Sequence, residues 1–296
     1  MDRVVITGGA GFIGSHVVDN LRKRGIAVTV FDRHLGPFHR NDLEFKLGDV
    51  KDRQSVMDVV ERNDGIIHLA AVLGTQETVT NASNVTSVNI QGSLNVFDAC
   101  KTHKKRGVYI AVGNHWMNNP YSISKTTAER LAIMYNREFG TQIAVVRGLN
   151  AYGPRQKPKP VRKVMPNFVI PALGGKELVI YGSGNQIMDM IYVEDLAEIL
   201  VRALVLNHGV FDRPMEAGMG LDTRINELAD LVLRTAGSGA SIRHVSMRPG
   251  EIPESVVKGD IETLKCLDMS LKQMVPLDEG VKRTVDWYKM NPQITQ

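Results

Sequence analysis

The fold class is decided near the N-terminus by the segment Thr7-Gly8-Gly9-Ala10-Gly11-Phe12-Ile13-Gly14-Ser15-His16, which follows the apolar run Arg3–Thr7. The apolar run has the length and the branched residues of a buried strand, and the amphipathic stretch 12–24 predicts a helix directly after the turn. Glycines spaced G-x-x-G-x-x-G between a strand and a helix are typical of a dinucleotide-binding turn. This context predicts a Rossmann-type βαβ unit.

Each glycine of this turn has its own expected task. Gly8 permits the tight turn, Gly11 lets the backbone approach a pyrophosphate, and Gly14 allows the helix to pack closely on the strand. Phe12 and Ile13 begin the helix, whose N-terminus offers unpaired N–H groups to phosphates. We expect these five residues to contact a dinucleotide; the alternative is a purely structural glycine turn.

An acidic residue lies where a second contact to the dinucleotide is expected. The predicted strand 27–31 ends at Asp32, 18 residues beyond Gly14. A carboxylate there accepts hydrogen bonds from the adenosine ribose hydroxyls and repels a 2′-phosphate, which favours NAD over NADP. Arg33 leaves NADP as an alternative cofactor, because a neighbouring guanidinium can bind the extra phosphate. The alternative for Asp32 is an ordinary acidic turn residue.

The first half of the chain alternates strand-like and helix-like segments. Further strands are expected at 43–47, 65–69, 108–112 and 143–147, with helices at 52–61, 85–103 and 122–139. This alternation predicts an α/β fold with a doubly wound parallel sheet that binds its ligand at the carboxyl ends of the strands.

The pattern of the sequence changes after Gly153. Five prolines over 154–171 indicate a looped segment, followed by short strands and by helices at 194–206 and 225–236. We therefore expect a Rossmann domain over 1–153. Residues 154–296 are expected to form mainly a smaller C-terminal α/β lobe that binds substrate, with some segments returning to the first domain.

Composition indicates a globular protein. The 296 residues are 43% apolar and carry a net charge of +4, and no segment reaches the roughly 18 uncharged apolar residues of a membrane span. The scattered basic residues favour neither a nucleic-acid nor a membrane partner, and the run 101–106 is interpreted as a solvated helix end, with a partner site as the alternative. Cys100 and Cys266 are far apart, so no metal site or disulfide is expected. Because Met1 leads directly into a strand, we expect no signal peptide and a cytoplasmic location.

A tyrosine and a lysine lie four residues apart at the start of the helix after the fifth strand, in Tyr121-Ser122-Ile123-Ser124-Lys125. With the glycine turn, Asp32, Gly48-Asp49-Val50, His68-Leu69-Ala70-Ala71 and Asn89, this motif makes the chain resemble the extended short-chain dehydrogenase/reductases. More narrowly, it resembles the NAD-dependent nucleotide-sugar epimerase/dehydratase family, in particular UDP-glucose 4-epimerases. The resemblance implies further cofactor contacts from Asp49, Val50, Leu69, Ala70, Ala71, Asn89, Tyr121 and Lys125.

The resemblance continues through the second half of the chain. It rests on Arg147-Gly148-Leu149-Asn150-Ala151-Tyr152-Gly153-Pro154-Arg155, Pro166-Asn167-Phe168, Leu178-Val179-Ile180-Tyr181-Gly182-Ser183-Gly184, 188–195 and Arg248-Pro249-Gly250-Glu251. In the family these segments contact a nucleotide sugar. The implied substrate contacts are Asn150, Asn167, Leu178, Val179, Tyr181, Arg248 and Glu251. Each motif taken alone fits an ordinary turn equally well.

The family's tyrosine, as a phenolate, removes a hydroxyl proton while hydride passes to the nicotinamide. A free tyrosine has a pKa of about 10 and is a weak base at neutral pH. Lys125 and the positive ring would favour the phenolate of Tyr121 electrostatically. The alternative is a buried tyrosine that caps a helix beside a solvated lysine.

Two departures from the family pattern affect the expected reaction. The family's Ser or Thr after the fifth strand is absent from Val112-Gly113-Asn114-His115, so either Tyr121 handles the proton alone or Asn114 or His115 replaces the hydroxyl. The family's acid–base pair for dehydration and its decarboxylase loop are missing as well. Met188 replaces a usual arginine, which leaves Arg248, or less directly Arg155, to bind the substrate phosphates.

These features predict an NAD-dependent 4-epimerase acting on a UDP-hexose or UDP-hexuronate. The alternatives are a keto-sugar reductase that consumes external NAD(P)H and a non-catalytic protein that binds NAD or a nucleotide sugar. Apolar stripes over 88–99 and 122–132 fit the helices through which similar proteins form homodimers, and they fit a buried core equally well.

Overall fold

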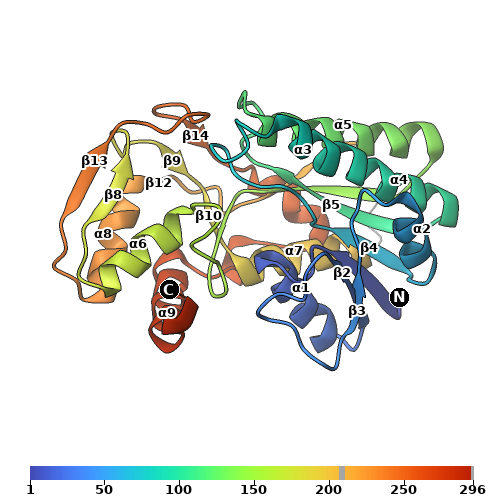
Figure 1. The fold of residues 1–296 in the computed structure, drawn as a ribbon, viewed down its shortest axis with the longest axis horizontal. Helices are drawn as coiled ribbons and strands as arrows, with labels where there is room; N and C mark the ends of the chain where they lie inside the picture. The colour runs from blue at the N-terminus through green and yellow to red at the C-terminus, as the bar shows by residue number, and fades with distance from the viewer. Residues whose placement is uncertain (207–210, 295–296) are drawn as a thin grey trace.

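A seven-stranded parallel sheet forms the centre of the protein, with strand order β3-β2-β1-β4-β5-β6-β11 (Figure 1). The computed structural model describes residues 1–206 and 211–294. The strands are β1 (Arg3–Thr7), β2 (Ala27–Asp32), β3 (Glu44–Leu47), β4 (Gly65–His68), β5 (Arg106–Val112), β6 (Ile143–Gly148) and β11 (Met215–Ala217). This order is the doubly wound Rossmann arrangement, in which the direction of winding reverses beside β1.

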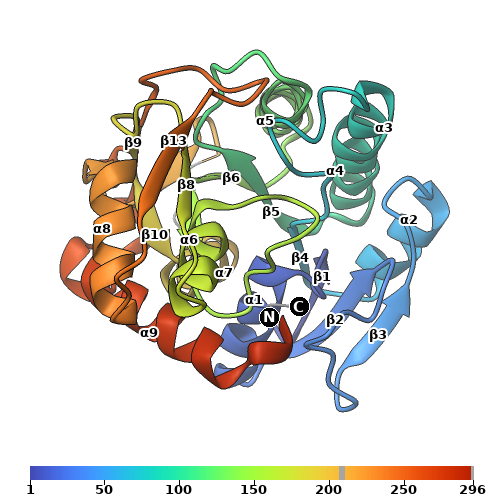
Figure 2. The ribbon, with the colours of Figure 1, turned by 60° about the vertical axis from the view of Figure 1, so that its left-hand side comes forward.

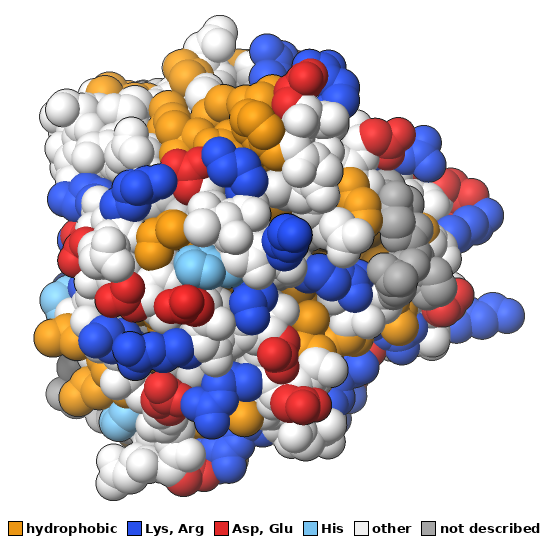
Figure 3. Space-filling model, turned by 90° about the vertical axis from the view of Figure 1, so that its right-hand side faces the viewer, with side chains coloured by type: hydrophobic (Ala, Val, Ile, Leu, Met, Phe, Trp, Pro, Cys, Tyr) orange, Lys and Arg blue, Asp and Glu red, His pale blue; other side chains and the backbone are white. Residues whose placement is uncertain are grey.

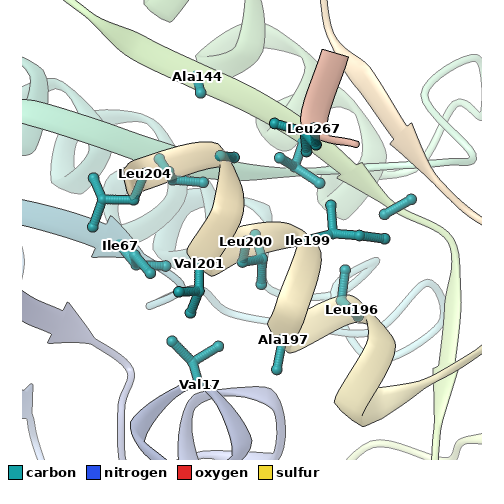
Figure 4. Close-up of a cluster of buried hydrophobic side chains, with 14 of the residues drawn as sticks. Val17, Ile67, Ala144, Leu196, Ala197, Ile199, Leu200, Val201, Leu204 and Leu267 are labelled. Carbon is teal, nitrogen blue, oxygen red and sulfur yellow. The ribbon is translucent and has the colours of Figure 1, made fainter. Parts of the chain in front are cut away.

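Helices cover both faces of the sheet. On one face lie α1 (Phe12–Lys23) and α7 (Val193–Val205); on the other lie α2 (Arg53–Glu61), α4 (Gly92–His103) and α5 (Pro120–Phe139). Figure 4 shows the apolar side of α7 packed toward Val17 of α1, Ile67 of β4 and Ala144 of β6. Because α7 and β11 follow the lobe segments in sequence, the chain returns to the central sheet late.

A second lobe is built from shorter elements around its own apolar cluster (Figure 2). Its helices are α6 (Val164–Leu173), α8 (Ile225–Ala236) and α9 (Leu277–Met290). Its strands pair as β7 (Asn150–Tyr152) with β10 (Met190–Tyr192), β8 (Leu178–Tyr181) with β13 (Ile242–Val245), and β9 (Ile187–Met188) with β12 (Thr223–Arg224) and β14 (Val256–Val257). The remaining helical segments are α3 (Ala82–Thr86), the π-helical η1 (Ser87–Gln91), η2 (Ile261–Leu267), η3 (Leu271–Gln273) and η4 (Pro292–Ile294).

The prediction of a looped segment after Gly153 is wrong over 164–173, where the chain forms α6. Pro166 lies in the first turn of this helix, where a missing N–H costs no intrahelical hydrogen bond. Pro171 lies near the other end, and the apolar side chains Met165, Phe168 and Val169 anchor the helix in the lobe's core. Tertiary packing therefore overrides the local proline signal.

The surface carries charges of both signs. On the face shown in Figure 3, Lys and Arg side chains are interspersed with Asp and Glu rather than forming one continuous basic area. No helix within residues 1–206 and 211–294 is long and apolar enough to cross a membrane. The same residues hold no group of three or more His, Cys, Asp or Glu side chains arranged for a metal ion.

Candidate active site

Two adjoining cavities lie beyond the carboxyl ends of the strands. The first, here called the sheet cavity, has a volume of about 390 Å³ and lies over the glycine turn. The second, here called the lobe cavity, has a volume of about 230 Å³ and lies between the sheet and the second lobe. Tyr121, Asn150, Lys163 and Met188 are among the residues that line both. A ligand in one cavity therefore meets a ligand in the other along this shared wall, to which Tyr121 belongs.

The glycine turn forms a cradle that a larger residue would fill. Gly8 has φ +72°, and a Cβ there would lie 2.8 Å from the backbone nitrogen of Ala70. At Gly14 a Cβ would lie 2.4 Å from the carbonyl oxygen of Gly8. The N-cap of α1 is Gly11, which supplies no side-chain cap, so the first N–H groups of the helix stay available to an anion. These features fit the pyrophosphate of a dinucleotide.

Asp32 lines the sheet cavity at the end of β2. Its carboxylate accepts hydrogen bonds from the backbone N–H of Ala10 at 3.1 Å and of Arg33 at 2.7 Å. The guanidinium of Arg33 lies 4.0 Å from the carboxylate of Asp49, and both side chains line the same cavity. Asp49 therefore offsets the positive charge of Arg33, which was the reason to keep NADP as an alternative cofactor.

Most of the expected cofactor residues reach the sheet cavity. Its lining includes Gly8, Gly11, Phe12, Ile13, Gly14, Asp32, Arg33, Asp49, Val50, Leu69, Ala70, Ala71, Tyr121 and Lys125. Asn89 does not belong to this lining. It is 1% exposed, and its amide accepts from the N–H of Val72 and donates to the carbonyl of Val72 at 2.8 and 3.0 Å. Asn89 therefore does not line the cavity itself but holds the backbone of Val72, which does.

Tyr121 and Lys125 lie in the first turns of α5, whose N-cap is Asn119. Lys125 is 2% exposed, and its Nζ lies 4.2 Å from the centroid of the Tyr109 ring. Burial lowers the pKa of Lys125 to about 7 and raises the pKa of Tyr121 to about 12. Without further positive charge, the pocket thus favours the neutral forms of both groups.

The space beside Gly113, after the end of β5, is occupied by a neighbouring apolar side chain. A Cβ on Gly113 would lie 2.1 Å from Cδ1 of Leu149, so Leu149 fills this space. Asn114 lines the lobe cavity, and its amide lies 3.3 Å from the sulfur of Met117. His115 is outside both linings, and its Nδ1 lies 3.2 Å from the carbonyl oxygen of Gly113. Of the two expected substitutes, only Asn114 reaches the cavity.

Residues of the second lobe complete the lobe cavity. The expected residues in its lining are Asn150, Asn167, Val179, Tyr181, Arg248 and Glu251. Arg248 lies over the Tyr181 ring, 5.0 Å from its centroid, and forms an ion pair with Glu251. Leu178 is not in the lining: it is fully buried in the lobe's core, so its side chain does not reach the cavity. The alternation of side chains along β8 turns Leu178 toward the core and Val179 toward the cavity.

Sequence reasoning missed Lys163, which lines both cavities just before α6. Burial lowers its pKa. Among the described residues, no carboxylate lies within ion-pair distance of its Nζ, although Glu77 and Glu251 act on it at longer range. The basic run 155–163 was the only signal for this residue, and it also fits a solvated loop.

The parallel sheet, the glycine cradle and the Tyr121–Lys125 pair define an enzyme of the extended short-chain dehydrogenase/reductase class. More specifically, the chain belongs to the NAD-dependent epimerase/dehydratase family, whose model matches residues 4–211. NAD is the cofactor of this family, and its members are nucleotide-sugar epimerases, dehydratases and decarboxylases.

The chain is similar over nearly its full length to enzymes of different reaction types. A UDP-N-acetyl-alpha-D-glucosaminuronate decarboxylase of Bacillus cytotoxicus is 29% identical, over 97% of this chain and 98% of that protein. The structure of a Thermotoga maritima UDP-glucose 4-epimerase with UDP-glucose has a TM-score of 0.90 at 26% identity, over 98% and 99% of the two chains. The structure of a Thermus thermophilus UDP-glucose 4-epimerase in complex with NAD has a TM-score of 0.87 at 27% identity, over 97% of this chain and 99% of that chain.

Exchanging Asp32 for asparagine is expected to change the preference between NAD and NADP. The amide can still accept from the Ala10 N–H, but the charge that repels a 2′-phosphate is gone. We expect the ratio of the dissociation constants to shift toward NADP by about tenfold, the equivalent of about 1.4 kcal/mol. Calorimetric titration of Asp32→Asn with both cofactors measures the ratio. An unchanged ratio would show that Asp32 does not face the ribose.

Proposed function

We propose that this protein is an NAD-dependent nucleotide-sugar 4-epimerase acting on a UDP-hexose or UDP-hexuronate. The observation that carries the proposal is the position of Tyr121 at the junction of the two cavities. The carboxylates in the lobe cavity lining are Glu77 and Glu251, and each is already bonded, to the N–H of Arg162 and to the Arg248 guanidinium. Epimerisation needs one acid–base group, whereas dehydration needs an additional pair.

The proposed reaction uses Tyr121 twice. NAD, when bound, would supply a reversible hydride acceptor for C4 of the sugar. The phenolate oxygen of Tyr121 removes the proton of the C4 hydroxyl as the hydride leaves, and gives it back when the hydride returns. We assign Lys125, one turn further along α5, to favour this phenolate electrostatically when it carries its proton. The proton and the hydride are both restored, so no cofactor is consumed.

Asn114 is the proposed replacement for the family's hydroxyl residue. Its side chain lines the lobe cavity on the loop that follows β5, and its carboxamide offers both a donor and an acceptor. We assign it to hold the reacting sugar oxygen within reach of Tyr121. The apolar Leu149 beside Gly113 lines both cavities.

Lys163 and Arg248 are the proposed contacts to the substrate diphosphate. Lys163 is partly buried, and an ammonium in such a place without a nearby carboxylate is costly unless an anion approaches it. Met188 lines the same cavities and offers no charge. Lys163 can therefore supply the cation that this chain lacks at Met188.

Replacing Lys163 by methionine is expected to weaken UDP binding about 10- to 100-fold, because one charge-assisted contact contributes about 1.5–3 kcal/mol. Adding Met188→Arg to this variant should restore part of the affinity. Calorimetric titration of the NAD-loaded proteins with UDP measures both changes. Lys176→Met is the matched control, since Lys176 is exposed between α6 and β8. Equal affinity in Lys163→Met and the wild type would contradict the assignment.

The proposed function is tested by incubating the protein and NAD with UDP-glucose, UDP-N-acetylglucosamine and UDP-glucuronate separately. NMR spectra of the anomeric protons follow interconversion at C4. We expect one of the three pairs to reach equilibrium with no net change in cofactor absorbance. Net oxidation of added NADH by a keto sugar would instead indicate a reductase, and tight NAD binding with no sugar conversion would indicate a non-catalytic protein.

A further inference from the structure

Asn119 is buried between the two lobes and bonds to both. It is 1% exposed and precedes Pro120, the first residue of α5. Its side-chain oxygen accepts from the backbone N–H of Ser122 at 2.9 Å, which caps the helix. Since an oxygen is required toward that N–H, the amide nitrogen points the other way. It donates to the carbonyl oxygen of Gly250 at 3.3 Å.

Gly250 belongs to the segment 248–251, which carries Arg248 and is fixed against the first domain. Gly250 has φ +80°, and a Cβ there would lie 2.9 Å from the carbonyl oxygen of Thr75. The hydroxyl of Thr75 donates to Glu251 at 3.0 Å, and Glu251 also binds Arg248. These contacts join the segment to the loop around Thr75, which also lines the lobe cavity.

We propose that Asn119 is a positioning residue that couples the phosphate-binding segment 248–251 to the first turn of α5, and so to Tyr121. Tyr121 follows Asn119 by two residues, and the Asn119 side chain fixes the helix start from the side of the second lobe. A substrate held by Arg248 would tighten the segment 248–251, and Asn119 would pass this constraint to the Tyr121 oxygen. This inference rests on the proposed function for the identity of the ligand.

The test separates this coupling from ordinary helix capping. Asn119→Ser keeps a side-chain cap for α5, whereas its shorter hydroxyl cannot also reach Gly250. We expect its melting temperature to stay within about 2 °C of the wild type, while kcat falls about tenfold. The midpoint of the acid limb of kcat against pH should move upward by half a unit or more, because a misplaced Tyr121 gains less from Lys125. Asn119→Asp also keeps the cap, presents a carboxylate to the Gly250 carbonyl, and should show a larger loss.

Amide hydrogen exchange supplies a readout that does not depend on turnover. UDP added to the NAD-loaded wild type should slow exchange over 119–125, and this protection should be lost in Asn119→Ser. Asp52→Ser is the control, because Asp52 caps α2 through Ser55 away from both cavities. Equal protection, kcat and acid limb in the wild type and Asn119→Ser would overturn the coupling.

The failure of the proposed function gives a different pattern. If UDP does not bind the wild type, the assigned substrate class is wrong. In that case, amide exchange of the ligand-free proteins still tests the coupling between Asn119 and the segment 248–251. Faster exchange over 248–252 in Asn119→Ser than in the wild type supports the coupling, and equal exchange overturns it.

Discussion

Replacing Tyr121 by phenylalanine is expected to lower the rate of sugar interconversion by about 10²–10⁴-fold, the usual contribution of a positioned acid–base group. The ring still fills the wall between the two cavities, so the binding of NAD and UDP should change little. The loss should therefore appear in kcat rather than in KM. The NMR assay that detects epimerisation measures it directly.

The matched control for this experiment is Tyr135→Phe. Tyr135 lies on the same helix, but its hydroxyl donates to Asp98 at 2.8 Å and lies outside both cavity linings. We expect the control to keep its turnover. If Tyr121→Phe retained wild-type turnover as well, the assigned mechanism would be wrong, and proton transfer would have to pass through another titratable group of the sheet cavity, such as Lys125.

The sheet could be predicted from the sequence because its signals are local. Each predicted strand of the first half has its counterpart in β1 to β6, and the glycine turn fixes where the sheet begins. The position of β11 could not be predicted, because three residues carry no periodicity and their pairing with β6 depends on distant chain segments. The helix α6 was hidden by its prolines for a related reason: its stability comes from the lobe's core.

The candidate site divides in the same way. The expected cofactor and substrate contacts reach the cavities except for Leu178 and Asn89, and the alternative residues His115 and Arg155 lie outside both linings. Leu178 belongs to a matching motif, but the packing of β8 on the lobe's core decides which side chains of that motif turn inward. Lys163 and Asn119 belong to no motif, and their positions follow only from the approach of one lobe to the other. Contacts across lobes are long-range, so no local pattern could have indicated them.

Replacing Lys125 by methionine is expected to have two opposite effects, a loss of turnover of about 10²-fold or more and a gain in the stability of the cofactor-free protein. Turnover falls because burial alone holds the pKa of Tyr121 at about 12, far from a usable phenolate. Stability rises because the pocket favours an uncharged side chain at this position. A methionine can also keep contact with the Tyr109 ring.

The gain in stability should depend on pH in a defined direction. The folded pKa of Lys125 is lowered from 10.5 to about 7, so the unfolded chain binds this proton more tightly than the folded one. The cost of burying the ammonium is therefore fully present in the wild type below pH 7, and it fades as the pH rises toward 10.5. We expect Lys125→Met to melt roughly 5–10 °C above the wild type at pH 7, with the gap closing in alkaline buffer. Lys282→Met, at an exposed site on α9, should show no such gap. If Lys125→Met melted no higher than the wild type at pH 7, the ammonium would not be destabilised by its burial, and the electrostatic link between Lys125 and Tyr121 would need another origin.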